Sequence, residues 1–278
     1  MKPAAPKVVA QTSKSAVSFG NSSLAAVIPC FNEARTIGPL ILRLFQHLNM
    51  VVVVDDGSAD ETSPKAEQAG AIVLQHDRNR GKGAALQTGL SHAYNLGCEW
   101  AVTLDGDGQH DPADLPALMQ CAEQTGAPLI IGNRMENADA MLWLRRHVNR
   151  WMSNKLSRFA GRPLPDTQSG FRVIHLQTWT DLRLSAQRFE VESEMLMAFL
   201  AAGHEVEFAP IRTIAAQRRS RIHPLADSLR WWKWWRTMKQ LVAERERSSI
   251  GRGVSGTSHT APSRPERIAE PKVTQAVP

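Results

Sequence analysis

Cysteine is scarce in this 278-residue chain, and long apolar runs are absent from it. The three cysteines, Cys30, Cys98 and Cys121, are scattered along the sequence, which excludes a disulfide framework and a zinc site with closely spaced ligands. No run reaches the about 18 apolar residues that a membrane-spanning helix needs. The N-terminal segment also lacks the apolar core of a secretory signal. We therefore expect a cytoplasmic protein whose thiols are buried.

Most of the chain has no excess of positive charge, because two segments carry the whole positive surplus. The hydrophobic fraction of 42% and charged fraction of 22% are ordinary for a soluble globular protein and exclude fibrous, collagen-like and fully disordered chains. The net charge is +6, yet Met141–Arg162 contributes +6 and Arg212–Gln240 contributes +7, which leaves −7 for the remainder. An anionic partner or surface is therefore expected to meet these two segments.

The two ends of the chain are expected to be disordered. Residues 1–22 are small and polar, and residues 246–278 are rich in Ser, Gly, Pro and Thr. Neither segment can bury enough apolar surface to offset the entropy lost on ordering. We expect one large folded domain over residues 23–222, followed by a basic, Trp-rich amphipathic helix over residues 223–245.

Short β-branched runs alternate with longer amphipathic segments in the folded part. The predicted strands are Leu24–Pro29, Val51–Val54, Ala71–Gln75, Trp100–Leu104 and Leu129–Gly132, and the clearest predicted helices are Glu33–Leu48 and Gly83–Leu96. Continuous apolar strands separated by helices are typical of a parallel sheet covered on both faces. The predicted fold class is therefore α/β, with a mostly parallel central sheet flanked by helices.

Polar clusters follow three of the predicted strands, at Pro29–Glu33, Asp55–Ser58 and Asp105–His110. Ligands of such sheets bind outside the carboxyl ends of the strands. Because parallel strands end at one edge, these clusters are expected to converge there. The sequence thus predicts a ligand site built from loops that are far apart along the chain.

The segment Asp105-Gly106-Asp107-Gly108-Gln109 is the strongest candidate for a metal site. Two carboxylates one residue apart offer the hard oxygen ligands that Mg²⁺ or Mn²⁺ prefer, with substrate phosphates completing the shell. Asp and Gly are also common in ordinary turns. The position of this segment directly after a predicted buried strand favours the metal site.

Two further clusters carry charge to the same edge. Asp55 or Asp56 is expected to face a ligand, whereas Asp60 is expected to cap the next helix. The segment Arg80–Gly83 looks like a phosphate-binding Walker loop, but His76 stands where its first glycine should be and Gly83 where Ser or Thr should follow the lysine. Lys82 is expected to add positive charge to the site.

Seven segments in a fixed order resemble the family 2 glycosyltransferases, most closely the dolichyl- or polyprenyl-phosphate sugar synthase branch. They are VIPCFNE, VVVVDDGSAD, RNRGKGAALQTGL, TLDGDGQHDP, IIGNR, DTQSGFRVI and FEVESEML. The resemblance covers about Leu24 to Ile222. The resemblance implies a GT-A fold, a UDP- or GDP-sugar donor, an inverting transfer that depends on Mg²⁺ or Mn²⁺, and a polyprenyl-phosphate-like lipid acceptor.

The resemblance also implies roles for particular positions. Asp105 and Asp107 match the metal ligands, Asp107 and Arg134 are implied catalytic residues, and Asp56 matches the residue that holds the nucleoside. The other implied donor-binding residues are Pro29, Phe31, Glu33, Lys82, Gly106, Gln109 and Arg219. Gly106 departs from the family pattern, since the lipid-phosphate enzymes more often have Ala there, although glycine keeps the turn feasible.

The acceptor decides whether a base is needed. A lipid phosphate is already anionic, whereas a hydroxyl acceptor needs a general base. Asp166 in the segment DTQSG is the candidate for base or for acceptor positioning, and a turn-capping role is equally open. Glu190, Glu192 and Glu194 alternate along a predicted helix, where none is expected to be catalytic and at least one to face solvent.

The two basic segments are candidates for contact with an anionic membrane surface. Met141–Phe159 has apolar residues at helical spacing with arginines between them, and Trp231, Trp232, Trp234 and Trp235 alternate with Arg and Lys in the second segment. Tryptophan favours the headgroup region and basic residues attract anionic lipid. We expect residues 225–240 to dock a peripheral protein on the inner face of the cytoplasmic membrane, with packing on the protein's own core as the alternative.

Other functions fit parts of the pattern. Tryptophans between basic residues can stack on single-stranded nucleic acid, but no nucleic-acid module accompanies them, so no nucleic-acid partner is expected. A nucleotidyltransferase usually has a Gly-rich phosphate loop after the first strand, where this chain has Cys30–Glu33. A glycosyltransferase with a hydroxyl acceptor and a non-catalytic nucleotide-sugar-binding protein remain alternatives.

Overall fold

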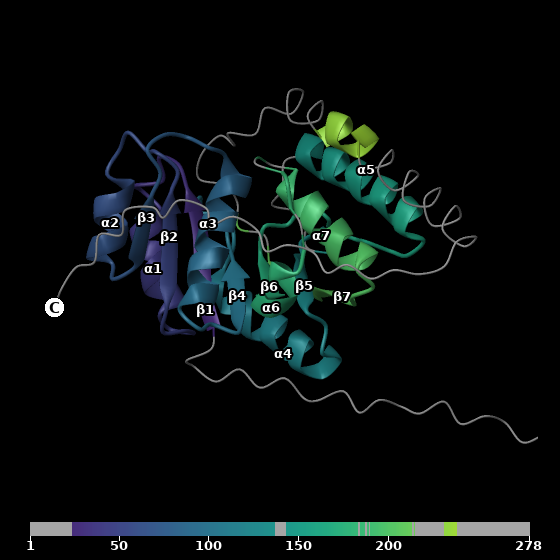
Figure 1. Cartoon of the computed structure of the whole chain (residues 1–278), viewed down its shortest axis with the longest axis horizontal. Helices are drawn as coiled ribbons and strands as arrows, with labels where there is room; N and C mark the ends of the chain where they lie inside the picture. The colour runs from purple at the N-terminus through teal and green to yellow at the C-terminus, as the bar shows by residue number, and fades with distance from the viewer. Residues whose placement is uncertain are drawn as a thin grey trace, which may run out of the picture.

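Seven strands form one mixed, mostly parallel sheet in the computed structural model (Figure 1), which describes residues 24–136, 143–182, 184–186, 188, 190–212, 214 and 231–237. The order across the sheet is β3-β2-β1-β4-β6-β5-β7, and only β6 runs antiparallel to its neighbours. The strands are β1 (Leu24–Cys30), β2 (Val51–Asp55), β3 (Ile72–Gln75), β4 (Trp100–Thr103), β5 (Leu129–Asn133), β6 (Arg172–His175) and β7 (Val206–Pro210). The predicted fold class is confirmed.

Helices cover both faces of the sheet. They are α1 (Ile37–Leu44), α2 (Thr62–Gln68), α3 (Lys82–Asn95), α4 (Leu115–Thr125), α5 (Trp143–Ala160), α6 (Leu176–Thr180) and α7 (Val191–Ala201), with a short 3₁₀ turn η1 (Pro112–Asp114). Alternate residues of each strand face opposite layers. Val27 belongs to the core cluster that includes residues of α3 and α7, whereas Ile28 belongs to the cluster that includes residues of α1 and α4. Burial on both faces explains why the strands have continuous apolar runs.

The first helix is shorter than the sequence predicts, because the residues before it hold loops together. The expected helix begins at Glu33, whereas α1 begins at Ile37. The backbone N–H of Glu33 donates to Thr62 Oγ1 (2.8 Å), and Thr36 Oγ1 donates to the carbonyl of Gly106 (2.6 Å). Residues 33–36 thus bind the start of α2 and the loop after β4 instead of extending the helix.

The topology brings the predicted polar clusters to one edge. Strands β2, β1 and β4 are adjacent and parallel, so their carboxyl ends lie together. The antiparallel β6 between β4 and β5 brings the loop before Arg172 to this same edge, where β5 also ends. The convergence predicted from the sequence is therefore confirmed, and the loop carrying Asp166 joins it.

Several sequence predictions concern residues outside the described part. The two expected disordered tails and all of residues 215–230 and 238–245, including Arg219, lie there. Residues 231–237 are described and are helical, and they lie beside α5 (Figure 1). Within the described residues, no helix combines the length and the apolar character that crossing a bilayer would require.

Candidate active site

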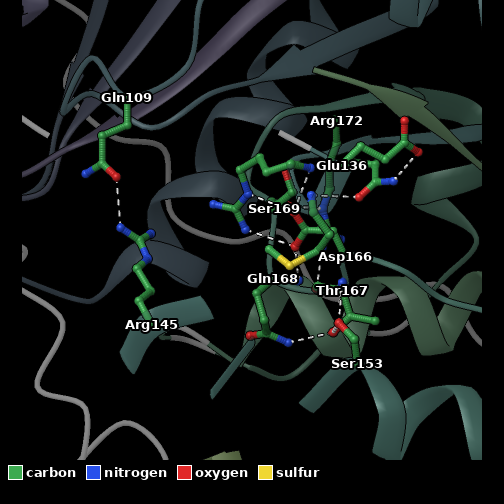
Figure 2. A network of polar contacts seen from close by, with 12 residues as sticks. Gln109, Glu136, Arg145, Ser153, Asp166, Thr167, Gln168, Ser169 and Arg172 are labelled. Atoms are coloured by element: carbon green, nitrogen blue, oxygen red, sulfur yellow. Dashed lines mark hydrogen bonds and ion pairs between the residues drawn. The ribbon is translucent and has the colours of Figure 1, made fainter. Parts of the chain in front are cut away.

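An acidic loop follows β4 and forms the centre of the site. Asp107 accepts hydrogen bonds from the backbone N–H (3.1 Å) and the side-chain amide of Gln109. Arg145, at the start of α5, donates to Gln109 Oε1 at 2.8 Å, and Figure 2 shows these two side chains facing each other. The loop is therefore fixed by its own amide and by a guanidinium from a distant helix.

The two carboxylates of this loop crowd each other. Burial raises the pKa of Asp105, but the Lys82 ammonium outweighs it and holds this pKa below its usual range. Burial and the nearby charge of Asp105 raise the pKa of Asp107. Two hard carboxylates whose mutual repulsion a cation would relieve fit Mg²⁺ or Mn²⁺. Among the described residues no group of three or more His, Cys, Asp or Glu side chains is placed to hold a metal ion.

Lys82 joins the acidic loop to α7. It is the first residue of α3, and its Nζ contacts Asp105 Oδ1 and lies 2.5 Å from Glu192 Oε1. The two carboxylates keep the lysine pKa above its usual value against the effect of burial. The predicted positive charge at the site is thus present, and Glu192 is brought to it from 87 residues further along the chain than Asp105.

Arg134 and Asp166 form a buried, two-pronged ion pair. Arg134 Nε and Nη2 lie 2.8 and 2.9 Å from the two carboxylate oxygens of Asp166, which also accepts from the Arg134 backbone N–H (3.1 Å). Burial alone would raise the pKa of Asp166, but the guanidinium lowers it overall. A carboxylate with a lowered pKa accepts a proton poorly, so this geometry favours positioning of Arg134 over base catalysis.

Arg172 holds the loop that carries Asp166. Its fully buried guanidinium donates to the carbonyls of Ser169 (2.8 Å), Thr167 (3.1 Å) and Glu192 (2.8 Å). Figure 2 shows Arg172, Ser169, Thr167 and Asp166 gathered in one polar network. Burial lowers the pKa of Arg172 to about 10. Arg172 thereby ties the 166–170 loop to the first turn of α7.

Asp55 and Asp56 hold loops at the end of β2. Asp56 accepts from the backbone N–H groups of Arg80 (2.8 Å) and Gly81 (2.7 Å), and His76 Nδ1 lies 2.6 Å away. Burial raises the pKa of Asp56, but these hydrogen bonds lower it overall. Asp55 accepts from the Ser58 N–H (2.9 Å) and Ser63 Oγ. Asp56 therefore fixes the loop that leads into Lys82, and its predicted contact with a nucleoside stays a prediction.

The remaining predicted residues lie at the same edge. Phe31, the residue after β1, is 36% exposed, and the neighbouring Asn32 adopts a left-handed backbone (φ 55°) and donates its N–H to Ser58 Oγ (2.7 Å). Asp60 accepts from the backbone N–H of Thr62 (3.1 Å), the first residue of α2. The predicted site residues that the described edge brings together are Pro29, Phe31, Glu33, Asp56, Lys82, Asp105, Gly106, Asp107, Gln109, Arg134 and Asp166.

The sequence interpretation missed several side chains of this site. Glu192 and Glu194 are both buried, whereas Glu190 is partly exposed. Glu194 holds the backbone of Ser185 and Ala186, and Glu192 reaches Lys82. The alternating glutamates predict a helix but do not indicate which of them faces the site. The sequence indicated Arg145 only as one of the basic residues of the predicted helix Met141–Phe159, not as a residue of the site.

The Trp-rich segment is divided between core and surface. Trp231 and Trp235 are buried, with ring centroids 5.8 Å apart and nearly parallel. Trp231 also donates to Ser193 Oγ (2.9 Å), whereas Trp232 is 42% exposed. Two of its rings therefore complete the hydrophobic core, which is the alternative that the sequence left open, and membrane docking of this segment stays a prediction.

Comparison with known proteins identifies the fold and the family. Residues 25–177 match the family model described as glycosyl transferase family 2. The UDP-N-acetylglucosamine–dolichyl-phosphate N-acetylglucosaminyltransferase of Methanococcus voltae is 30% identical over 211 residues, which cover 68% of this chain and 84% of that protein. The dodecaprenyl-phosphate galacturonate synthase of Rhizobium johnstonii is 30% identical over 59% of this chain, which spans about half of that protein (51%).

A solved structure shares the architecture. The glucosyl-3-phosphoglycerate synthase of Mycobacterium tuberculosis, in complex with Mn²⁺, UDP and glucosyl-3-phosphoglycerate, superposes with a TM-score of 0.62. The match covers 76% of this chain and 77% of that one, at 20% sequence identity. At this identity the likeness concerns the fold.

Proposed function

This chain belongs to glycosyl transferase family 2, and we propose that it transfers one sugar, with inversion, from a UDP- or GDP-sugar to a polyprenyl-phosphate-like lipid. The observation that carries the proposal is the acidic pair Asp105 and Asp107, at an edge where Lys82, Arg134 and Arg145 supply positive charge. Two relatives named for dolichyl-phosphate and dodecaprenyl-phosphate acceptors support the lipid acceptor.

Asp105 and Asp107 would hold Mg²⁺ or Mn²⁺. A divalent cation there would stabilise the negative charge that develops on the departing diphosphate. Gln109 orients Asp107 through two hydrogen bonds, and Arg145 in turn orients Gln109. The complex of the structurally similar synthase with Mn²⁺ and UDP supports the use of a divalent metal with a nucleotide.

The donor would lie along the ends of β1, β2 and β4. We assign Pro29, Phe31 and Glu33 to the nucleoside side, together with Asp56. Gly106 and Gln109 would flank the diphosphate, with Lys82 beside them. Arg219 is proposed as a late basic residue near the diphosphate and lies outside the described residues. Ile214, which precedes it in the sequence, donates its N–H to the Gln109 carbonyl at 3.3 Å.

The state of Asp166 supports an acceptor that is already anionic. Both of its carboxylate oxygens are engaged by Arg134, and its pKa is lowered. A lipid phosphate attacks without losing a proton, so it needs no strong base. A hydroxyl acceptor would need Asp166 to accept a proton while it is paired with a guanidinium.

We propose that the acceptor is reached from a membrane surface, with the protein peripheral at the inner face of the cytoplasmic membrane. Trp143 (72% exposed), Trp151 (43%) and Trp232 (42%) lie on α5 and the adjoining 231–237 helix. Lys155 and Arg236 lie against the Trp151 and Trp232 rings, at 5.5 and 4.8 Å from their centroids. Exposed indoles beside cations suit an anionic headgroup region.

A screen of nucleotide sugars tests the function. The full-length protein is incubated with each donor and Mn²⁺ or Mg²⁺, with and without a short polyprenyl phosphate, and the release of UDP or GDP is measured. We expect release that requires the lipid, stops with a chelator and returns with the metal. A product with the anomeric configuration of the donor would contradict inversion, and release that ignores the lipid would contradict the acceptor.

Asp107→Asn is the matched test of the acidic pair. It keeps the shape of the side chain but removes a charge from the site. We expect turnover to fall by about a thousandfold or more, while circular dichroism and the melting temperature stay close to those of the wild type. Near wild-type turnover in this variant would contradict the assignment of Asp107.

A further inference from the structure

Lys82 occupies a position that the local chemistry disfavours. It is the first residue of α3, where the helix dipole is positive and a cation is repelled. Its side chain is only 15% exposed, so it cannot extend into water to avoid that field. Residues that break a local rule in a well-packed fold are expected at functional sites.

Two carboxylates offset this cost and leave a negative charge behind. Asp105 and Glu192 both contact the Lys82 ammonium, so the three side chains together carry −1. Glu192 is 6% exposed, and its Oε1, although 2.5 Å from Lys82 Nζ, accepts no well-directed hydrogen bond from the described residues. A buried oxygen with such a contact is expected to gain a better donor when a ligand arrives.

The position of Lys82 and Glu192 indicates which part of a ligand they would contact. This step depends on the proposed function, in which Asp105 and Asp107 face the diphosphate of the donor. The sugar is bonded to the second phosphate, so it must lie close to Asp105. The backbone of Gly170 packs against Asp105 and Lys82, because a Cβ on residue 170 would lie 2.9 Å from Asp105 Oδ1 and 3.1 Å from Lys82 Nζ.

We infer that Lys82 and Glu192 bind the hydroxyl groups of the transferred sugar, with the carboxylate accepting and the ammonium donating, and that they discriminate among donor sugars. Asp105 would bind the metal, so Glu192 supplies the carboxylate that faces the sugar beside Lys82. The subsite therefore favours a neutral sugar over a uronic acid, whose carboxylate Glu192 would repel.

The test compares a nucleotide with its sugar conjugate in the full-length protein. Titration calorimetry with Mn²⁺ measures the affinities for UDP, UDP-glucose and UDP-glucuronate, or for GDP and GDP-mannose if the wild type binds GDP instead. In Glu192→Gln we expect UDP to bind within about twofold of the wild type, whereas the affinity for UDP-glucose relative to UDP falls about tenfold. We expect the preference for UDP-glucose over UDP-glucuronate to narrow.

Two further variants keep the test decisive. Glu190→Gln makes the same charge change at the same end of α7. It is expected to leave the affinities for UDP-glucose and UDP-glucuronate relative to UDP unchanged. Lys82→Arg retains the cation if Glu192→Gln fails to fold, and it is expected to weaken UDP-glucose more than UDP. If the affinity for UDP-glucose relative to UDP is unchanged in Glu192→Gln, or if UDP and UDP-glucose are weakened equally, the inference is overturned. A wild type that binds neither UDP nor GDP would overturn the proposed function and this inference with it.

Discussion

Gly106 lies directly over the thiol of Cys30. A Cβ built on Gly106 would be 2.6 Å from Cys30 Sγ and 3.4 Å from Glu33 Cγ, both at or below the limit of normal packing. The lipid-phosphate enzymes that this sequence resembles more often have alanine at the middle of the acidic pair. The departure has a physical reason here, because the Cys30 thiol fills the space that a methyl group would need.

A Gly106→Ala variant is therefore expected to be less stable and less active. Overpacking should lower the free energy of unfolding by about 1–3 kcal/mol and displace Asp107 from Gln109, which reduces turnover. The double variant Cys30→Ala/Gly106→Ala removes the clash and should recover most of both losses. Urea denaturation and donor turnover measure the two effects, with Cys30→Ala as the control. Full stability of Gly106→Ala alone would contradict this account.

The Arg134–Asp166 pair is expected to make stability depend on acid. Asp166→Asn leaves a buried guanidinium without a counter-charge, which should cost about 3–5 kcal/mol at pH 7. Because the folded pKa of Asp166 is below its unfolded value near 4, its contribution is complete above about pH 4 and is lost as the pH falls through the folded pKa.

Denaturation of the wild type and Asp166→Asn at several pH values checks this. The difference in unfolding free energy should be constant from about pH 7 to pH 5 and shrink below about pH 4. The exposed Asp181→Asn is the matched control and should show little difference at any pH. If the difference in unfolding free energy between the wild type and Asp166→Asn stayed constant into strong acid, it would contradict a stabilising Arg134–Asp166 ion pair.

At the scale of elements, α5 connects the active site to the surface. One face packs through Met152 and Leu156 into the core, and the other exposes Trp143 and Trp151. The 231–237 helix adds to both faces, since Trp231 and Trp235 meet Trp151 and Phe159 with ring centroids 5.4 and 5.1 Å apart. The two helices therefore form one unit whose inner and outer tryptophans have different roles.

Single tryptophan substitutions should separate these two roles. Trp231→Ala removes a buried ring and its bond to Ser193, so it should lower the free energy of unfolding by about 3–5 kcal/mol. Trp232→Ala should change stability by less than about 0.5 kcal/mol but weaken binding to anionic vesicles. Thermal unfolding and vesicle co-sedimentation measure the two quantities. Equal loss of stability in both variants would contradict the division.

At the scale of the whole molecule, charge of opposite sign is separated along the chain. The basic surplus lies in Met141–Arg162 and Arg212–Gln240, and the rest carries −7. In the described part, α5 presents exposed Arg150, Lys155 and Arg158 on the unit that also carries the indoles. An anionic surface would thus attract one region and repel the remainder, which would orient the protein.

Vesicle binding should therefore depend on lipid charge and on salt. Each exposed cation near an anionic surface contributes about 1 kcal/mol, and salt screens this attraction within about a Debye length. We expect strong partitioning to vesicles that contain phosphatidylglycerol, weak partitioning to pure phosphatidylcholine, and a decrease of about tenfold or more as NaCl rises from about 0.05 to 0.5 M. Equal partitioning to both kinds of vesicle would contradict electrostatic binding of this surface to an anionic membrane.

The sequence by itself determined the α/β sheet and the edge at which the site lies. Buried parallel strands leave continuous apolar runs, and the residues that follow them must share an edge, so local patterns were enough for Asp105, Asp107 and Lys82. Helix boundaries were less well determined, because residues 33–36 bind two segments that are distant in the sequence, the start of α2 at Thr62 and the loop at Gly106.

Only the tertiary structure decided which distant side chains meet. The antiparallel β6 brings Asp166 onto Arg134, and the start of α7 brings Glu192 onto Lys82. Periodicity says which face of an element is apolar, but it does not say what packs against that face. For the same reason the sequence could not assign Trp231 to the core and Trp232 to the surface, since that division depends on where α5 lies.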